Sequence, residues 1–367
     1  MKKGTFDSAC ACRHTFCFAQ MSWLEQKIRR YEHARWTTDD NRRVLPFEWG
    51  LEHIGGRADE PDPRGFLRRW VPETIAHSKE WYATTPGEDY RLISEPSANG
   101  RGTTQLLTFT SQIRSPWEEN NRVVARFFPA RKSGPAVVVM PNWNAKWHGQ
   151  VNLCRWLNVV GITALRISLP YHDRRAIPGH ERADYVVGPN IGLTLQASRQ
   201  AVTDVRRCLR WLEQQGYGKL GLLGTSIGSA VGFITMAHDH AVRAGAFMHI
   251  SKNFGDVVRT GITTAHVWEG LRTKVTEAEL HYFWEPISPF PYIGLLDPAR
   301  QKMVAITGKY DPTMLPEFTE EIIAAVKGRG IDMDVLRLNC GHYSLELPPF
   351  SWYAGGRLAT FLFRELA

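Results

Sequence analysis

A serine at position 226 lies in a pattern typical of a nucleophile. Residues 224–228 read Gly-Thr-Ser-Ile-Gly, directly after an apolar run and directly before small residues that favour a helix. Glycines on both sides permit the sharp, strained turn that lifts a hydroxyl out of a sheet. The start of the helix offers backbone N–H groups and a dipole that stabilise a developing negative charge. The alternative for Ser226 is an ordinary turn serine.

A serine hydroxyl needs a base, held by a third group, before it can attack a carbonyl carbon. Asp311 and His342 are the candidates for the acid and the base, because each follows an apolar run that predicts a strand. The carboxyl ends of parallel strands meet at one edge of a sheet, which would bring both side chains to Ser226. Asp256, after an earlier predicted strand, is the alternative acid.

The elements that must position these residues are visible as short, continuous apolar runs. Continuous rather than alternating apolarity is typical of parallel strands covered on both faces. Segments with helical spacing, at 151–160 and 195–212, lie between the runs. The alternation predicts an α/β fold with a doubly wound, mainly parallel sheet. The runs are 136–140, 162–167, 220–223, 244–248, 303–306 and 333–338, preceded by two predicted strands at 106–110 and 123–128.

The rest of the chain is divided by composition. We expect residues 1–21 to be a disordered extension; the alternative is a metal cluster of three cysteines and a histidine. Residues 22–104 are rich in Trp and Arg, thin in other apolar residues, and predict an N-terminal helical extension packed on the core. The main domain would be 105–367, with a helical lid insertion at about 251–300 that is rich in aromatic residues. The three cysteines and the histidine are Cys10, Cys12, Cys17 and His14.

Composition excludes several classes of function. Of 367 residues, 43% are hydrophobic, and 45 basic against 37 acidic residues give a net charge of +8. The basic residues form no run of five, so nucleic-acid binding is not expected. No apolar stretch approaches the length of about 18 residues that a membrane span needs, and no secretory signal is visible. We expect a cytoplasmic protein with no stable membrane insertion. Cys154, Cys208 and Cys340 should be buried free thiols. The sequence does not specify the oligomeric state.

With the turn at 224–228, the acid in 308–311 and the base in 341–342, residues 105–367 resemble the α/β-hydrolase superfamily. Within it the chain is most similar to bacterial esterases and dienelactone-hydrolase-like serine hydrolases. It is also similar to a family with eukaryotic members that carries Pro-x-Trp-Asn after the third strand, here residues 141–144. The resemblance implies an oxyanion hole. One donor would be the backbone N–H of Ile227. The second would be the backbone N–H of Trp143 in the 141–144 loop, with the side chains of Asn142 and Asn144 as alternatives. Another possibility for Trp143 is that it only caps the sheet.

Several residues are candidates for substrate binding. They are Asn144, His172, Arg174 and Trp284. An arginine at 174 or 175 could pair with a substrate carboxylate, although an internal salt bridge with Asp173 or Glu181 is the alternative. The His-Asp-His sequence at 238–240 could bind a metal, but a solvated helix end explains it as well.

The function that these residues predict is hydrolysis of a carboxylic ester on a small molecule. His342 would take the proton of Ser226, Asp311 would orient His342, and an acyl-enzyme would be released by water. This chemistry requires no metal and no organic cofactor. The alternatives are a lipid deacylase or acyltransferase with the same triad, and a catalytically silent hydrolase fold used for binding.

Overall fold

The continuous apolar runs form the parallel strands of one sheet, as the fourth strand illustrates. All five residues of β4 (Ala136–Met140) are buried, because Ala136, Val138 and Met140 face one hydrophobic core while Val137 and Val139 face the other. A strand covered on both faces has no polar alternation, which explains the continuous pattern. The computed structural model describes residues 22–38, 41–85, 87–96, 102–130 and 134–367; the extension expected at 1–21, with its candidate metal cluster, lies outside them.

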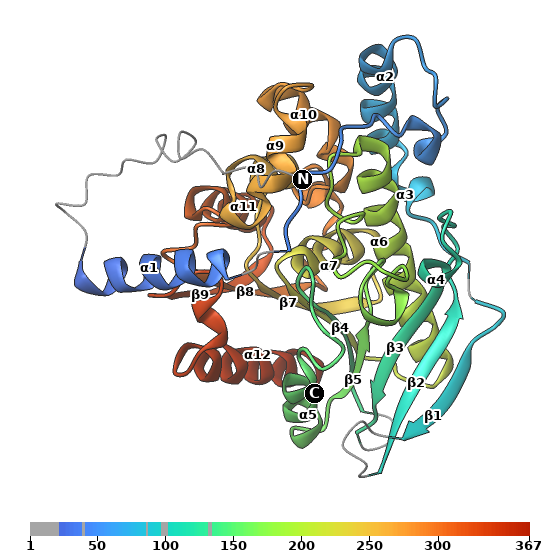
Figure 1. The fold of residues 1–367 in the computed structure, drawn as a ribbon. Coiled ribbons are helices and arrows are strands. Elements are labelled where there is room, and N and C mark those ends of the chain that lie inside the picture. The colour runs from blue at the N-terminus through green and yellow to red at the C-terminus, as the bar shows by residue number, and fades with distance from the viewer. Residues whose placement is uncertain (1–21, 39–40, 86, 97–101, 131–133) are drawn as a thin grey trace.

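The described residues form a nine-stranded sheet in the order β1-β2-β3-β5-β4-β6-β7-β8-β9 (Figure 1). The pairs β1–β2, β2–β3 and β3–β5 are antiparallel and the others are parallel. The predicted α/β fold with a mainly parallel sheet is therefore confirmed. The remaining strands are β1 (Arg91–Pro96), β2 (Thr103–Thr110), β3 (Arg122–Phe128), β5 (Thr163–Ile167), β6 (Leu220–Thr225), β7 (Val242–Met248), β8 (Lys302–Gly308) and β9 (Asp332–Leu338).

Helices cover both faces of this sheet (Figure 1). Their apolar sides complete two cores: α5 (Val151–Val159) and α12 (Phe350–Leu366) contribute to one, and α6 (Ile191–Gln214), α7 (Ile227–His238) and α11 (Pro316–Gly328) to the other. The long helix α6 has clear end signals. The Asn190 side chain accepts the N–H of Leu193 at its start, and Gly216, with φ 88°, follows its end.

The described residues before β2 form three α-helices, one 3₁₀ turn at Leu51–Ile54 and one strand. The helices are α1 (Trp23–Thr37), α2 (Pro63–Ala76) and α3 (Ser78–Trp81), and the strand is β1. The helices α1 and α2 lie in the stretch 22–104 that we expected to be helical, but the strand β1 lies there too. This edge strand carries polar residues and leaves Leu92 half exposed, so it has no continuous apolar run. Tyr82 ties the region to the main domain by donating to the carbonyl of Pro286.

Between β7 and β8 the chain forms three short helices and several 3₁₀ turns. The helices are α8 (Phe254–Thr260), α9 (Ala265–Leu271) and α10 (Glu277–Phe283). Three of the seven Phe, Trp and Tyr side chains of this segment are buried, and one, Phe290, is exposed. Phe283, Trp284 and Tyr292 belong to the same core as α6 and α7, so they pack the segment onto the main domain.

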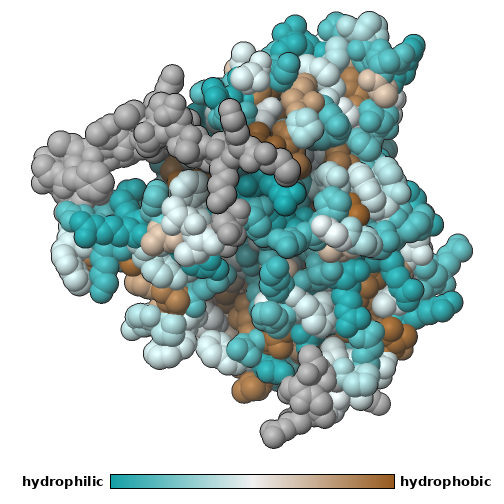
Figure 2. Space-filling model, in the orientation of Figure 1, coloured by the Kyte–Doolittle hydropathy of each residue, from teal (hydrophilic) through white to brown (hydrophobic). Residues whose placement is uncertain are grey.

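The interior is apolar and the visible surface is not. Cys154, Cys208 and Cys340 are buried free thiols, as predicted. The face in Figure 2 is mainly hydrophilic, with its hydrophobic side chains in small scattered groups. In the described part of the chain, no helix combines the length and apolarity needed to cross a bilayer.

Candidate active site

Ser226 occupies a strained turn between β6 and α7. Its backbone has φ 56° and ψ −120°, a combination that costs a non-glycine residue about 1–3 kcal/mol. Close packing explains the flanking glycines. A Cβ atom on Gly224 would lie 2.3 Å from the carbonyl oxygen of Gly228, and one on Gly228 would lie 2.3 Å from that of Met140. The backbone N–H of Ser226 donates to Met248 at the end of β7, which fixes the turn to the sheet.

Asp311 and His342 are joined at the same edge of the sheet. Asp311 follows β8 and His342 follows β9; the His342 Nδ1 lies 2.9 Å from Asp311 Oδ2. The other carboxylate oxygen accepts the backbone N–H groups of Thr313 at 2.7 Å and Met314 at 2.9 Å. Asp311 is buried, so its carboxylate is held in one orientation by these contacts. The Nε2 atom of His342 is left for a proton from another group.

The electrostatics of the pair favour a charged acid and a basic imidazole. Burial by itself would raise the pKa of Asp311, but the neighbouring His342 and His249, together with the hydrogen bond from His342, hold that pKa far below its usual value. Burial also acts to lower the pKa of His342; Asp311 opposes it most strongly, and the resulting pKa lies above the ordinary 6.5. Asp311 therefore stays ionised and stabilises an imidazolium on His342.

Ser226 and His342 line one cavity of about 300 Å³. Their side chains form no hydrogen bond with each other, and the Oγ of Ser226 forms no hydrogen bond with any other described residue. Catalytic hydrogen bonds are often long before substrate binds. The apolar residues that line the cavity are Val187, Ala230, Phe254, Val257, Val258 and Met314. The charged residues that line it are Arg35, Arg42, Lys146, Glu181, Arg182 and Glu346.

The two residues whose backbone amides are the candidate oxyanion donors line the same cavity as Ser226. Ile227 is the first residue of α7, and Trp143 lies in the loop after β4; both line the cavity. Gly228 packs against this loop so tightly that a Cβ atom there would lie 2.7 Å from the oxygen of Pro141. The N–H of Trp143 has no acceptor among the described residues. Asn142 also lines the cavity, and its side-chain amide lies 3.3 Å from the carbonyl of Trp143.

The loop that carries Trp143 is fixed by its side chains. The Trp143 indole donates to the carbonyl of Ala183 at 3.0 Å and stacks on His266 with ring centroids 5.7 Å apart. Asn144, with φ 59°, donates its backbone N–H to His172 and accepts the N–H of Ala183 on its side chain. The Trp143 ring thus has a packing role, and this role leaves its backbone N–H available.

Three of the candidate substrate-binding residues lie outside the Ser226 cavity. His172 is buried, which lowers its pKa to about 4, and its ring contacts the carbonyl of Pro170 and the N–H of Asn144. Arg174 forms two hydrogen bonds with Glu95 of β1, at 3.1 and 2.8 Å, rather than pairing with Asp173 or Glu181. Both line a neighbouring cavity. Trp284 is fully buried beneath α6 and lines neither.

Asp256 and the His-Asp-His segment at 238–240 contact residues away from the triad. Asp256 lies 3.1 Å from His281 of α10, whereas His342 is bonded to Asp311. In the segment at 238–240, His238 contacts the carbonyl of Ile234 and Asp239 pairs with Arg210. The side chains of His238 and Asp239 are thus turned to different neighbours, and the side chain of His240 is exposed.

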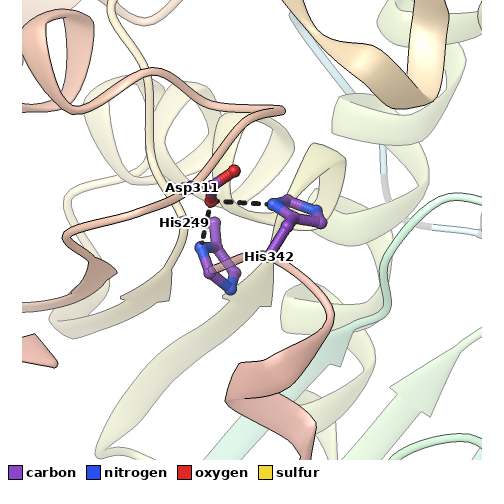
Figure 3. A group of neighbouring side chains, drawn as sticks. All are labelled: His249, Asp311 and His342. Carbon is purple, nitrogen blue, oxygen red and sulfur yellow. Dashed lines mark hydrogen bonds and ion pairs between the residues drawn. The ribbon is translucent and has the colours of Figure 1, made fainter. Parts of the chain in front are cut away.

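His249, for which the sequence pattern predicted no role, is the third member of this cluster (Figure 3). It follows β7 directly, has φ 55°, and places Nδ1 2.8 Å from the same Asp311 oxygen that His342 contacts. Its ring centroid lies 4.3 Å from that of His342. Burial and the neighbouring His342 lower the pKa of His249, so it is neutral. Its position at the end of a predicted strand was the available signal.

The same three residues are the candidate metal site in the described part of the chain. Their ligand atoms all lie within 4.8 Å of one another. Both nitrogens approach one oxygen of Asp311, at 2.8 Å from His249 and 2.9 Å from His342, and the other oxygen accepts two backbone N–H groups. Among the described residues, the His342 contact is a hydrogen bond, whereas neither ring nitrogen of His249 has a hydrogen-bond partner. We therefore interpret the cluster as a carboxylate hydrogen-bonded by His342, with the His249 ring packed against both.

Comparison with known proteins supports the fold. No protein-family model and no curated protein sequence matches the chain. Among solved structures, acetyl xylan esterase 1 from Thermoanaerobacterium sp. is similar over 83% of this chain and 98% of its own, with a TM-score of 0.57 and 13% identity. The acetyl xylan esterase from Paenibacillus sp. R4 is similar over 79% of this chain and 93% of its own, with a TM-score of 0.55 and 13% identity.

The acylaminoacyl peptidase of Pyrococcus horikoshii is also similar, with a TM-score of 0.54 and 12% identity over 76% of this chain. The chain spans only 42% of the length of that peptidase. These neighbours and the sheet order establish that the chain has the α/β-hydrolase fold, as its motifs indicated.

Proposed function

We propose that this protein is a serine hydrolase that cleaves carboxylic esters through an acyl-enzyme intermediate. The observation that carries the proposal is that the strained Ser226 and the Asp311–His342 pair meet at one cavity. A protein that used this fold only for binding would need neither the strain at Ser226 nor a buried carboxylate on the imidazole.

In the proposed mechanism, the Oγ of Ser226 attacks the ester carbonyl carbon while Nε2 of His342 takes the hydroxyl proton. The N–H groups of Ile227 and Trp143 bind the oxyanion, and Asp311 stabilises the imidazolium. His342 then gives the proton to the departing alcohol oxygen, leaving the acyl group on Ser226. Water, activated by His342, attacks this acyl-enzyme and releases the acid.

The cavity supports a small acyl group. Its volume of about 300 Å³ is at the low end for ligand pockets, and the apolar residues in its lining suit a short alkyl chain. Two of the structural neighbours are named as acetyl xylan esterases, which agrees with an acetyl or similarly short acyl group. We therefore propose a small ester with a short acyl group as the substrate.

Ser226→Ala tests the mechanism. We expect wild-type protein to hydrolyse p-nitrophenyl acetate and to be labelled by a fluorophosphonate at Ser226, while Ser226→Ala does neither above background, a loss of at least about 10³-fold. Ser229→Ala is the matched control, since Ser229 lies one turn further along α7 and donates to the carbonyl of Met248. Full activity of Ser226→Ala, or labelling at another residue, would refute the proposal.

A further inference from the structure

A carboxylate from α1 lies against the loop that carries His342. Glu32 is only 1% exposed, and its two oxygens accept the backbone N–H groups of Tyr343 and Ser344, each at 2.8 Å. Tyr343 is the residue directly after His342. A Cβ atom on Gly341, directly before His342, would lie 2.5 Å from the Glu32 carboxyl carbon. The whole segment 341–344 is therefore shaped around the Glu32 side chain.

The burial of Glu32 is unusual for the helix it belongs to. In α1 only Ile28 and Glu32 are buried, and the first residue, Trp23, is exposed. No lysine or arginine in the described ranges forms an ion pair with Glu32; its hydrogen bonds there all come from the His342 loop. Burying a carboxylate without a cation is costly unless its oxygens are hydrogen-bonded. A helix that buries one apolar side chain and one carboxylate is therefore attached largely through this loop.

We propose that Glu32 is a positioning residue for His342, so that α1, which lies outside the sheet, is part of the catalytic centre. The inference rests on the proposed function of the Ser226 site. Two backbone hydrogen bonds from Tyr343 and Ser344 to Glu32 hold the loop, in addition to the bond between His342 and Asp311. The Glu32 carboxylate also places a second negative charge near the imidazole that becomes protonated in the proposed mechanism. Removing only the charge of Glu32 should then shift the pH dependence of the reaction, whereas removing the whole side chain should also release the loop and lower kcat.

The charged groups around the loop determine the direction in which loss of the Glu32 charge shifts the pKa of His342. Asp311, Glu32 and Glu346 raise the pKa of His342 against the effect of burial. The other titratable groups that face the loop or Glu32 are His249 after β7, Cys340 after β9, Arg29 and Arg35 on α1, and Arg42. Arg29 pairs with Glu25, and Arg35 lies over the Tyr343 ring. The Arg42 guanidinium lies 3.4 Å from the Tyr343 hydroxyl. A guanidinium only donates hydrogen bonds, so no arginine can take the place of Glu32 as acceptor of the two backbone N–H groups.

The experiment compares Glu32→Gln and Glu32→Ala with Glu25→Gln, an exchange on the same helix. The Glu25 carboxylate accepts a hydrogen bond from Arg29, and the bond to Ser22 is donated by the Glu25 backbone N–H, which the exchange keeps. Glutamine keeps the shape and can accept a backbone N–H, but it has no charge. We expect the acid limb of the kcat/KM profile of Glu32→Gln to move to lower pH by about 0.5 unit. Glu32→Ala should lose about 10- to 100-fold in kcat with little change in KM, because the loop is no longer fixed. Glu25→Gln should match wild type.

The outcomes separate this inference from the proposed function. If wild-type protein neither hydrolyses p-nitrophenyl acetate nor reacts with a fluorophosphonate, the proposed function fails first. If wild-type protein is active and both Glu32 variants keep its kcat and its pH profile, the positioning role is refuted. A uniform loss in Glu32→Gln with an unmoved acid limb would also refute it, since it would indicate general structural support. Circular dichroism identifies a misfolded Glu32→Ala, in which case the Glu32→Gln profile alone decides.

Discussion

The replacement of Asp311 by asparagine tests the triad most directly, because the structure separates its catalytic effect from its effect on folding. One carboxylate oxygen contacts the backbone N–H groups of Thr313 and Met314, and an asparagine oxygen can keep both bonds. The other oxygen contacts Nδ1 of His342 at 2.9 Å. An NH₂ group there would face an N–H and would favour the tautomer that carries its proton on Nε2. Such an imidazole cannot accept the proton of Ser226.

The expected loss in kcat is about 10⁴-fold, which corresponds to about 5.4 kcal/mol in activation free energy. The assay is kcat and KM for p-nitrophenyl acetate at pH 8, with circular dichroism and urea unfolding to verify the fold. Asp256→Asn is the matched control, because Asp256 lies equally inside the domain but contacts His281. We expect its kcat within about threefold of wild type. An Asp311→Asn protein that is folded and within tenfold of wild-type kcat would contradict the assignment of Asp311.

Two further predictions concern the base and the turn. The pKa of His342 is raised above 6.5, and His342 must be neutral to act as the base. We therefore expect kcat/KM to be retained above that pKa and to fall as the pH decreases through it. A pH profile with its acid midpoint below 6.5 would contradict this prediction. Gly228→Ala places a Cβ atom 2.3 Å from the backbone oxygen of Met140, so urea unfolding should show a loss of about 3 kcal/mol in stability. The control Gly356→Ala meets no atom within 4 Å on an exposed turn of α12 and should instead gain about 0.5–1 kcal/mol. Equal stability of the two variants would show that the turn tolerates a side chain.

The parallel strands could be predicted from the sequence because their burial on both faces leaves a local signal. The triad candidates could be selected for a related reason, since Ser226, Asp311 and His342 each follow such a strand, and strand ends are points that a sequence marks. The edge strand β1 leaves no such signal. Its residues alternate between exposed and half-buried positions, and Glu95 is recruited by Arg174 from a distant loop.

Residue type alone could not tell which polar or aromatic side chains reach the cavity. Trp284 is the type of residue expected to line a lid, but it is buried against α6. Its type does not decide between the two places, because an aromatic ring packs equally well into a core or a pocket. His172 is likewise an internal hydrogen-bonding residue. Which face of a short helix or loop turns inward is decided by its neighbours in space, and these are far away in the chain.

Glu32 shows how strongly such distant contacts bear on the site. It is separated from Tyr343 by 311 residues, and in the sequence it is one of several charged residues on a polar helix. Charged residues on such a helix normally face water. Only the fold reveals that this one ends at two backbone N–H groups beside His342, where a glycine at 341 makes room for it. In the proposed mechanism the α/β core supplies the three catalytic side chains, and in our further inference a helix that precedes the core holds one of them in place. We infer that the region before residue 105 belongs to the active site as well as to the packing of the domain.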